Sequence, residues 1–172
     1  MGSQVFSGAA GQSRQVLDAI RRIVQILRES SREAEKRGLS GAQLFVLRTL
    51  AESPGLSLTD LAERTRTHQS SVSVVVSRLV DLRLVERSRA AGDARRMQLQ
   101  LSADGLSRIR TASQTAQERL VAAVDALPRA TRARLASVLD ALVRELDLGG
   151  ANPEMFFEES ARRARKARLA DA

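Results

Sequence analysis

The chain has 172 residues, enough for one domain or two small lobes, and its 43% of hydrophobic residues are ample for a buried core. A net charge of +8, almost all of it from arginine, favours a polyanionic partner, since arginine suits phosphate and guanine recognition. There is no cysteine and one histidine, His68, which excludes disulfides, a thiol switch and a zinc site built on several Cys or His side chains.

No part of the sequence predicts insertion into a membrane. Every apolar run is far shorter than the ~20 residues that a membrane span needs. The N-terminus also lacks the apolar core of a signal peptide. We therefore expect a cytoplasmic, nucleoid-associated protein without a membrane partner.

The N-terminal part of the chain predicts a long helix after an irregular start. Residues 1–12 are mostly small and polar, and we expect them to be flexible. Residues 13–38 predict a dimerisation helix that ends at Gly38. Its apolar stripe consists of Val16, Ile20, Ile23, Val24 and Leu27. A helix of about 40 Å, at ~1.5 Å per residue, cannot bury that stripe on a small lobe, so it needs a partner helix from this chain or a second copy.

Residues 39–101 predict a compact lobe that begins with two short helices. The first is apolar and ends at the Ser-Pro-Gly sequence of residues 53–55. The second begins at Ser57 or Thr59, whose hydroxyl can cap it, and Asp60 favours the positive end of its dipole. The residues expected to face inward from the second helix are Leu61 and Ala62.

The next helix has two faces of different composition. The apolar face consists of Val72, Val75, Val76, Leu79 and Leu82. The opposite face consists of Gln69, Ser70, Ser73, Val74, Ser77 and Arg78. Small uncharged side chains let a helix lie deep in a DNA major groove, where Gln can pair with adenine and a Val methyl can contact thymine. The alternative is a serine-rich helix that only faces solvent.

Residues 84–101 predict a two-stranded hairpin with its turn at residues 90–94. The alternation of a half-buried strand is carried by Met97, Gln98, Leu99, Gln100 and Leu101. Arginines dominate this ribbon, which favours contacts with phosphates or with a narrow minor groove. Asp93 lies two residues before Arg95 and can orient its guanidinium through a bidentate bond. The alternative is an Asp that only stabilises the turn beside arginines that bind nothing.

Residues 102–148 predict two further dimerisation helices. The first begins at a cap on Ser102 and ends at Pro128, and the second begins near Thr131. Their inward residues are expected to be Leu106, Ile109, Ala112, Ala116, Leu120, Val124 and Leu127, then Leu135, Val138, Leu139, Leu142 and Leu146. These stripes are too apolar for a monomer surface, so we expect an isologous homodimer in which the helices interdigitate. The alternative is a monomeric three-helix bundle on top of the lobe.

Residues 149–172 form a basic C-terminal extension whose start resembles a capped helix, with Asn152 followed by Pro153. Phe156 and Phe157 can anchor it on the dimer helices. Its basic end, residues 161–169, can instead lengthen a DNA footprint. A solvated chain end is the third possibility.

Four short motifs stand out in the lobe and at its exit. They are Leu58, Leu61 and Ala62 in the second helix, RLVDLRLVER at Arg78–Arg87, Asp93 and Arg95 at the hairpin tip, and Leu101, Ser102 and Gly105. In combination they resemble the MarR family of bacterial transcription regulators, over about residues 39–146. Two positions depart from the family pattern, because Arg66 stands where the turn usually has Gly and Ala94 replaces the first Arg of an Asp-Arg-Arg tip.

The resemblance implies a mainly α fold, with a winged helix-turn-helix DNA-binding lobe, a two-stranded wing and long N- and C-terminal dimerisation helices. It implies a homodimeric regulator, usually a repressor, that binds an inverted repeat in double-stranded DNA. Many members release DNA when a small, often aromatic or phenolic, ligand binds between the lobe and the dimer helices. In this chain the lack of Tyr and Trp and the many arginines favour an acidic ligand.

No catalytic constellation is present, since there is no Gly-rich phosphate loop and no Ser/His/Asp set, so we expect neither an enzyme nor a cofactor. His68 suits a phosphate contact or a helix cap. The predicted DNA-binding residues are His68, Gln69, Ser70, Ser71, Ser73, Val74, Ser77, Arg78, Arg87, Arg89, Asp93, Arg95 and Arg96. The alternative function is an architectural or protein-interaction DNA binder with little sequence preference.

Overall fold

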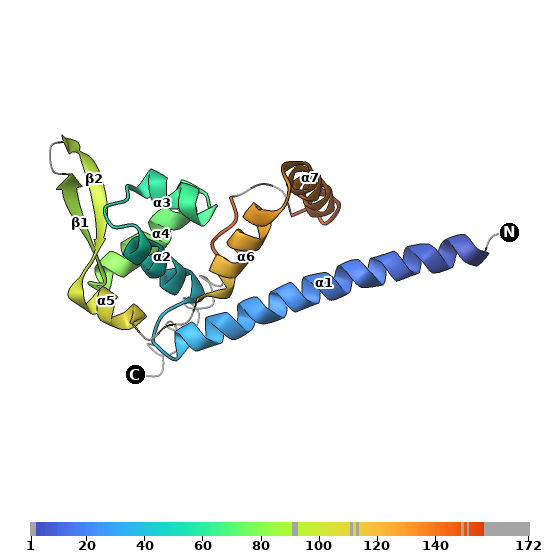
Figure 1. Cartoon of the computed structure of the whole chain (residues 1–172), viewed down its shortest axis with the longest axis horizontal. Coiled ribbons are helices and arrows are strands. Elements are labelled where there is room, and N and C mark those ends of the chain that lie inside the picture. The colour runs from blue at the N-terminus through green and yellow to red at the C-terminus, as the bar shows by residue number, and fades with distance from the viewer. Residues whose placement is uncertain are drawn as a thin grey trace.

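The structure is a computed structural model that describes residues 3–90, 93–110, 112, 114–148, 150 and 152–156, without the side chains of residues 3–9 and 90–96. Within these residues it is mainly helical with one antiparallel pair of strands, which confirms the predicted fold class. The elements are α1 (Ser3–Glu35), α2 (Gly41–Glu52), α3 (Leu58–Thr65), α4 (Gln69–Asp81), β1 (Val85–Ala90), β2 (Asp93–Leu101), α5 (Ala103–Ile109), α6 (Ala116–Ala126) and α7 (Arg129–Glu145) (Figure 1). No helix in the described part of the chain is both long and apolar enough to cross a bilayer.

The core lies in the winged lobe, where α2, α3, α4 and the root of the hairpin meet. Its most deeply buried side chains are Val46, Leu47, Leu50, Leu61, Val72, Val75, Val76, Leu79 and Val85. Helices α2, α3, α5 and α6 begin where a side chain caps them. Ser57, rather than Thr59, caps α3, because its hydroxyl accepts a bond from the Asp60 N–H and the Asp60 carboxylate accepts one from the Ser57 N–H.

The wing is the hairpin of β1 and β2, which protrudes from the lobe in Figure 1. Its root is tied to the loop before α3, because the Leu99 N–H donates to the Leu56 carbonyl at 2.9 Å and the Gly55 N–H donates to the Leu99 carbonyl at 3.2 Å. Leu99 is buried at this root, whereas Met97 nearer the tip is exposed. The predicted alternation therefore produces a buried face only where the hairpin meets the lobe.

The N-terminus differs from the sequence expectation. We expected a flexible segment over residues 1–12, but α1 already begins at Ser3. Extending an existing helix fixes one residue per added hydrogen bond, so weak helix formers such as the glycines of this segment are tolerated at its end. With 33 residues, α1 is about 50 Å long at ~1.5 Å per residue. In Figure 1 its N-terminal half extends away from the rest of the chain.

The single helix expected from Ser102 to Pro128 is wrong, because it is two helices, α5 and α6. Thr115 caps α6 in a reciprocal capping box with Glu118. Arg48 of α2 holds the same carboxylate, with its Nε 2.8 Å from the nearer oxygen. The apolar spacing continues across the break, but a Thr followed three residues later by a Glu offers the backbone a new helix start.

The apolar face of α7, which was expected to be buried in a dimer, is not covered within one chain. None of the residues of α7 is buried. Its large exposed apolar side chains are Leu135, Val138, Leu139, Leu142 and Val143, followed by Leu146 and Leu148 after the helix. Val16, Leu17, Ile23 and Ile26 of α1 are exposed as well. An apolar surface of this kind is typical of an interface with another molecule.

The described start of the C-terminal extension, residues 152–156, is not the helix that Asn152 and Pro153 predicted. The chain forms neither helix nor strand there, and Met155 enters the core of the lobe. The Pro153 carbonyl accepts a bond from the Ser71 hydroxyl at 2.7 Å, so a partner in the lobe replaces a helical one.

Candidate nucleic-acid interface

Helix α4 presents the face that was predicted to read DNA. Its opposite face packs into the core of the lobe through buried Val72, Val75 and Leu79. The solvent side carries exposed Gln69, Ser70, Val74 and Ser77, with half-buried Ser73 and Arg78 beside them. Val74 is 45% exposed, which is unusual for an aliphatic residue in a helix whose other valines are covered. These side chains share one surface, and their contact with DNA stays a prediction.

Two residues of this helix were assigned to the wrong environment. Ser71 was predicted to contact DNA, but it is only 8% exposed and its hydroxyl is bonded to Pro153. Position 71 lies next to the apolar face, and a serine is small enough to be covered there. Leu82 was expected in the core but is exposed, because Arg83 adopts a left-handed conformation (φ 58°) and turns Leu84 into the core instead.

His68 is the residue before α4, and its role as a side-chain cap is wrong. Its imidazole makes no capping bond, although its carbonyl accepts the first helical bond, from the Val72 N–H at 3.1 Å. The side chain is exposed at the start of the helix. Its predicted phosphate contact is compatible with this position.

The wing places further arginines beside α4. Arg87 and Arg89 are exposed on β1, and Arg87 Nη2 donates to the Ser77 hydroxyl at 3.3 Å. This bond connects the wing to the outward face of α4. Asp93, Arg95 and Arg96 belong to β2, but their side chains, including the predicted bond between Asp93 and Arg95, lie outside the described residues.

The turn between α3 and α4 is built around Arg66, at the position where the family pattern has Gly. Arg66 has φ 53° and ψ 42°, the left-handed conformation that suits Gly and strains other residues. Its backbone N–H caps α3, and its Nη1 donates to the Glu63 carbonyl at 2.9 Å. Its guanidinium also lies 3.1 Å from the carboxylate of Asp125 in α6. The side chain therefore links the turn to α6, a contact that no local sequence pattern predicts.

Comparison with known proteins assigns this lobe to a family. Residues 37–96, which include Arg66, all of α4 and most of the wing, match the model of the MarR family. The winged lobe is a MarR-family domain. Over 71 residues the chain is 35% identical to the HTH-type transcriptional repressor MdtR of Bacillus subtilis (strain 168). That match covers 41% of this chain and 46% of MdtR, so it spans about half the length of the curated relative.

Solved MarR-family structures share the fold beyond the lobe. The likeness to MarR of E. coli in its apo form has a TM-score of 0.50 at 18% identity and covers 73% of this chain and 95% of that one. The likeness to BpsR of Bordetella bronchiseptica, whose DNA binding is regulated by 6-hydroxynicotinic acid, has a TM-score of 0.51 at 24% identity and covers 76% and 91%. MarR-family proteins are transcription regulators and not enzymes, as the absence of a catalytic constellation predicted.

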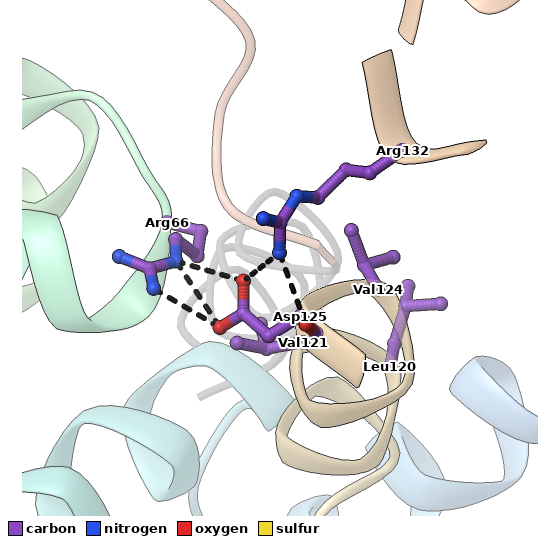
Figure 2. A pocket seen from close by; sticks show the side chains of 6 residues that line it. All are labelled: Arg66, Leu120, Val121, Val124, Asp125 and Arg132. Atoms are coloured by element: carbon purple, nitrogen blue, oxygen red, sulfur yellow. Dashed lines mark hydrogen bonds and ion pairs between the residues drawn. The ribbon is translucent and has the colours of Figure 1, made fainter. Parts of the chain in front are cut away.

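A pocket of about 530 Å³ lies between the MarR lobe and the helices that follow it. Figure 2 shows Asp125 between two arginines, with Arg66 from the turn on one side and Arg132 from α7 on the other. The Asp125–Arg132 distance is 3.6 Å. The apolar wall consists of Leu120, Val121 and Val124. The part of the chain that the structure describes contains no group of three or more acidic or His side chains that could hold a metal ion.

Proposed function

We propose that this chain is a homodimeric, sequence-specific repressor of transcription that binds an inverted repeat in double-stranded DNA. The observation that carries the proposal is the outward face of α4, where exposed Val74 lies among small uncharged side chains, beside the exposed wing arginines. A face selected only for solubility would carry charged residues, whereas this one suits the major groove. MdtR, the relative that the lobe matches, is a repressor.

In this proposal the residues have distinct roles. Base edges are read by Gln69, Ser70, Ser73, Val74 and Ser77. Phosphates are contacted by His68, Arg78, Arg87, Arg89 and Arg96. Arg95, oriented by Asp93, enters the minor groove at the end of each half-site. Phosphate contacts fix the register of the protein on the duplex, and base contacts supply the specificity.

The second copy is needed because one chain leaves its long helices uncovered. Residues 39–101 are the DNA-binding lobe, while residues 13–38 and 102–148 form what we call the dimer frame. Exposed apolar residues of α1 and α7, such as Leu17 and Leu139, would be buried against the partner. The frame would then hold two copies of α4 about 34 Å apart, on one side of the duplex.

A small acidic ligand is the proposed signal for release. The pocket between Arg66 and Arg132 joins the lobe to the frame, and both arginines contact one carboxylate, that of Asp125. A ligand carboxylate could replace Asp125 as their partner, with its apolar part on the wall formed by α6. To release DNA, the ligand must favour a spacing of the two lobes other than the one that fits the operator.

The test compares two duplexes at physiological salt. Binding to the DNA upstream of the gene for this chain should exceed binding to a scrambled duplex by at least ~10³. A ratio near one would replace the proposal with an architectural binder. Arg95→Ala provides the second comparison, since a sequence-specific dimer loses affinity mainly on A·T-flanked sites, whereas a nonspecific binder loses it evenly.

A further inference from the structure

The segment Asn152–Phe156, which we call the strap, lies along the winged lobe. In Figure 1 it is the orange-red trace that descends between α3 and α6. Met155 is 6% exposed and belongs to the main core of the lobe, although more than 50 residues separate it in sequence from β2. Phe156, the next residue, is 52% exposed. The strap is therefore attached to the lobe by Met155.

Two buried polar side chains receive the strap. The Ser71 hydroxyl, in the first turn of α4, donates to the Pro153 carbonyl at 2.7 Å. Gln117 Nε2, in the first turn of α6, donates to the Phe156 carbonyl at 3.2 Å. Both Ser71 and Gln117 are more than nine-tenths buried, where a polar group without a partner is costly. The strap backbone supplies partners for the Ser71 hydroxyl and for Gln117 Nε2, while Gln117 Oε1 has no partner among the described residues.

The two bonds belong to different parts of the molecule. Ser71 is on the proposed recognition helix, whereas Gln117 is on a helix of the proposed dimer frame. The four residues from Pro153 to Phe156 bridge the two, with Met155 packed between the bonds. A rotation of the lobe against α6 would have to break one bond or withdraw Met155 from the core.

The geometry points to the strap as a positioning element for DNA recognition, which sets the orientation of α4 relative to the dimer frame. Ser71, Gln117 and Met155 are its positioning residues, and none of them touches DNA. The inference rests on the proposed function, because the orientation of α4 matters for binding only if two copies must enter successive grooves together. It also explains why a serine on the recognition helix faces inward.

The first experiment measures operator binding by full-length Met155→Ala, with Phe156→Ala as the matched control one residue away. Met155→Ala should weaken operator binding about tenfold, as expected if the released lobe adopts the competent orientation about one-tenth of the time. Binding to a scrambled duplex and the salt dependence of affinity should not change, because no charge is removed. An equal loss on both duplexes, or no loss on the operator, would overturn the inference.

The second experiment needs no DNA and follows amide hydrogen exchange of α4. Exchange of the Val72–Val76 amides should accelerate about tenfold in Met155→Ala and stay unchanged in Phe156→Ala. If Met155→Ala does not fold, Ser71→Ala removes only the bond to Pro153 and should accelerate the same amides. Unchanged exchange in the folded variant would refute the strap. A full chain without operator preference would refute the proposed function instead, and the exchange result would still stand.

Discussion

The winged lobe and the long helices α1 and α7 differ in how far they bury their apolar side chains within one chain. The lobe covers Leu47, Leu61 and Val75 completely within one chain. Helix α7 has no buried residue, and among the described side chains of α1, from residue 10 on, the buried apolar ones lie toward its C-terminal end, as at Leu27. The lobe therefore has its own core, whereas the long helices leave apolar side chains exposed that the proposed dimer would cover. If the proposed dimer forms, the stability of the frame should depend on protein concentration, whereas that of the lobe should not.

The comparison is tested most severely by a charge on α7. Leu139→Glu should abolish the dimer, since an unpaired carboxylate would have to be buried in the interface. Light scattering should then report one 18.7 kDa chain, and operator affinity should fall by about 10² to 10⁴ as the two half-sites become independent. Ser137→Glu, two residues away and on the other side of the helix, is the control. A dimeric Leu139→Glu protein would show that α7 has another role.

The converse change disturbs the contact between α5, the first helix of the frame, and the wing root of the lobe. A Cβ on Gly105 would overlap the carbonyl oxygen of Leu84, a backbone atom that cannot simply move aside. Gly105→Ala should therefore cost about 1–3 kcal/mol of lobe stability, measured by chemical denaturation. The exposed neighbour in the same helix provides the control Ser107→Ala, which should behave like the wild type. Wild-type stability of Gly105→Ala would mean that α5 can shift away from the wing root.

The proposed interface is tested by Gln69→Ala, which alters neither core nor frame. Loss of the amide should reduce operator binding by about 1–3 kcal/mol and relax the preference at one base pair. Asp81→Ala, at the other end of α4, is the control and should leave that preference intact. If Gln69→Ala and Asp81→Ala have the same affinity as each other for every sequence tested, Gln69 does not read a base.

The smallest expected effect concerns the junction of the two regions, Arg66. Arg66→Gly relieves the left-handed strain, and this gain should roughly offset the lost contact with Asp125, whereas Arg66→Ala loses the contact and keeps the strain. The Gly variant should therefore be about 1 kcal/mol more stable than the Ala variant in thermal unfolding. Equal stability of the two variants would show that the turn is not strained.

Local signals predicted the lobe well, because they act between residues close in sequence. The start of α3 followed from Ser57 and Asp60, and the faces of α4 from the spacing of its valines. The break before α6 had an equally local signal, the capping pair Thr115 and Glu118. It was overlooked because the helical spacing of apolar residues continues across the break. At Ser71, which borders the two faces of α4, periodicity alone cannot decide the direction.

Contacts between distant segments were not predictable from periodicity. Nothing around Met155 indicates a core residue, and Asn152 with Pro153 favoured a helix until the lobe supplied other partners. Asp125 likewise has no sequence signal that sets it apart from a solvent-facing acid, yet its carboxylate forms ion pairs with both Arg66 and Arg132. The apolar stripe of α7 was recognised correctly, and in the proposed dimer a second copy of the chain would bury it.

The wing root has a mechanical consequence. Backbone bonds between Leu99 and the residues Gly55 and Leu56 fix one end of the hairpin, while its other end projects from the lobe. A body pivoted at one end moves most at the other, so a small tilt of the lobe becomes a much larger sweep at the tip, where the chain carries Arg95. In the proposed complex with DNA, that arginine should thus be the first contact to leave the duplex when the half-sites drift out of phase, well before α4 disengages.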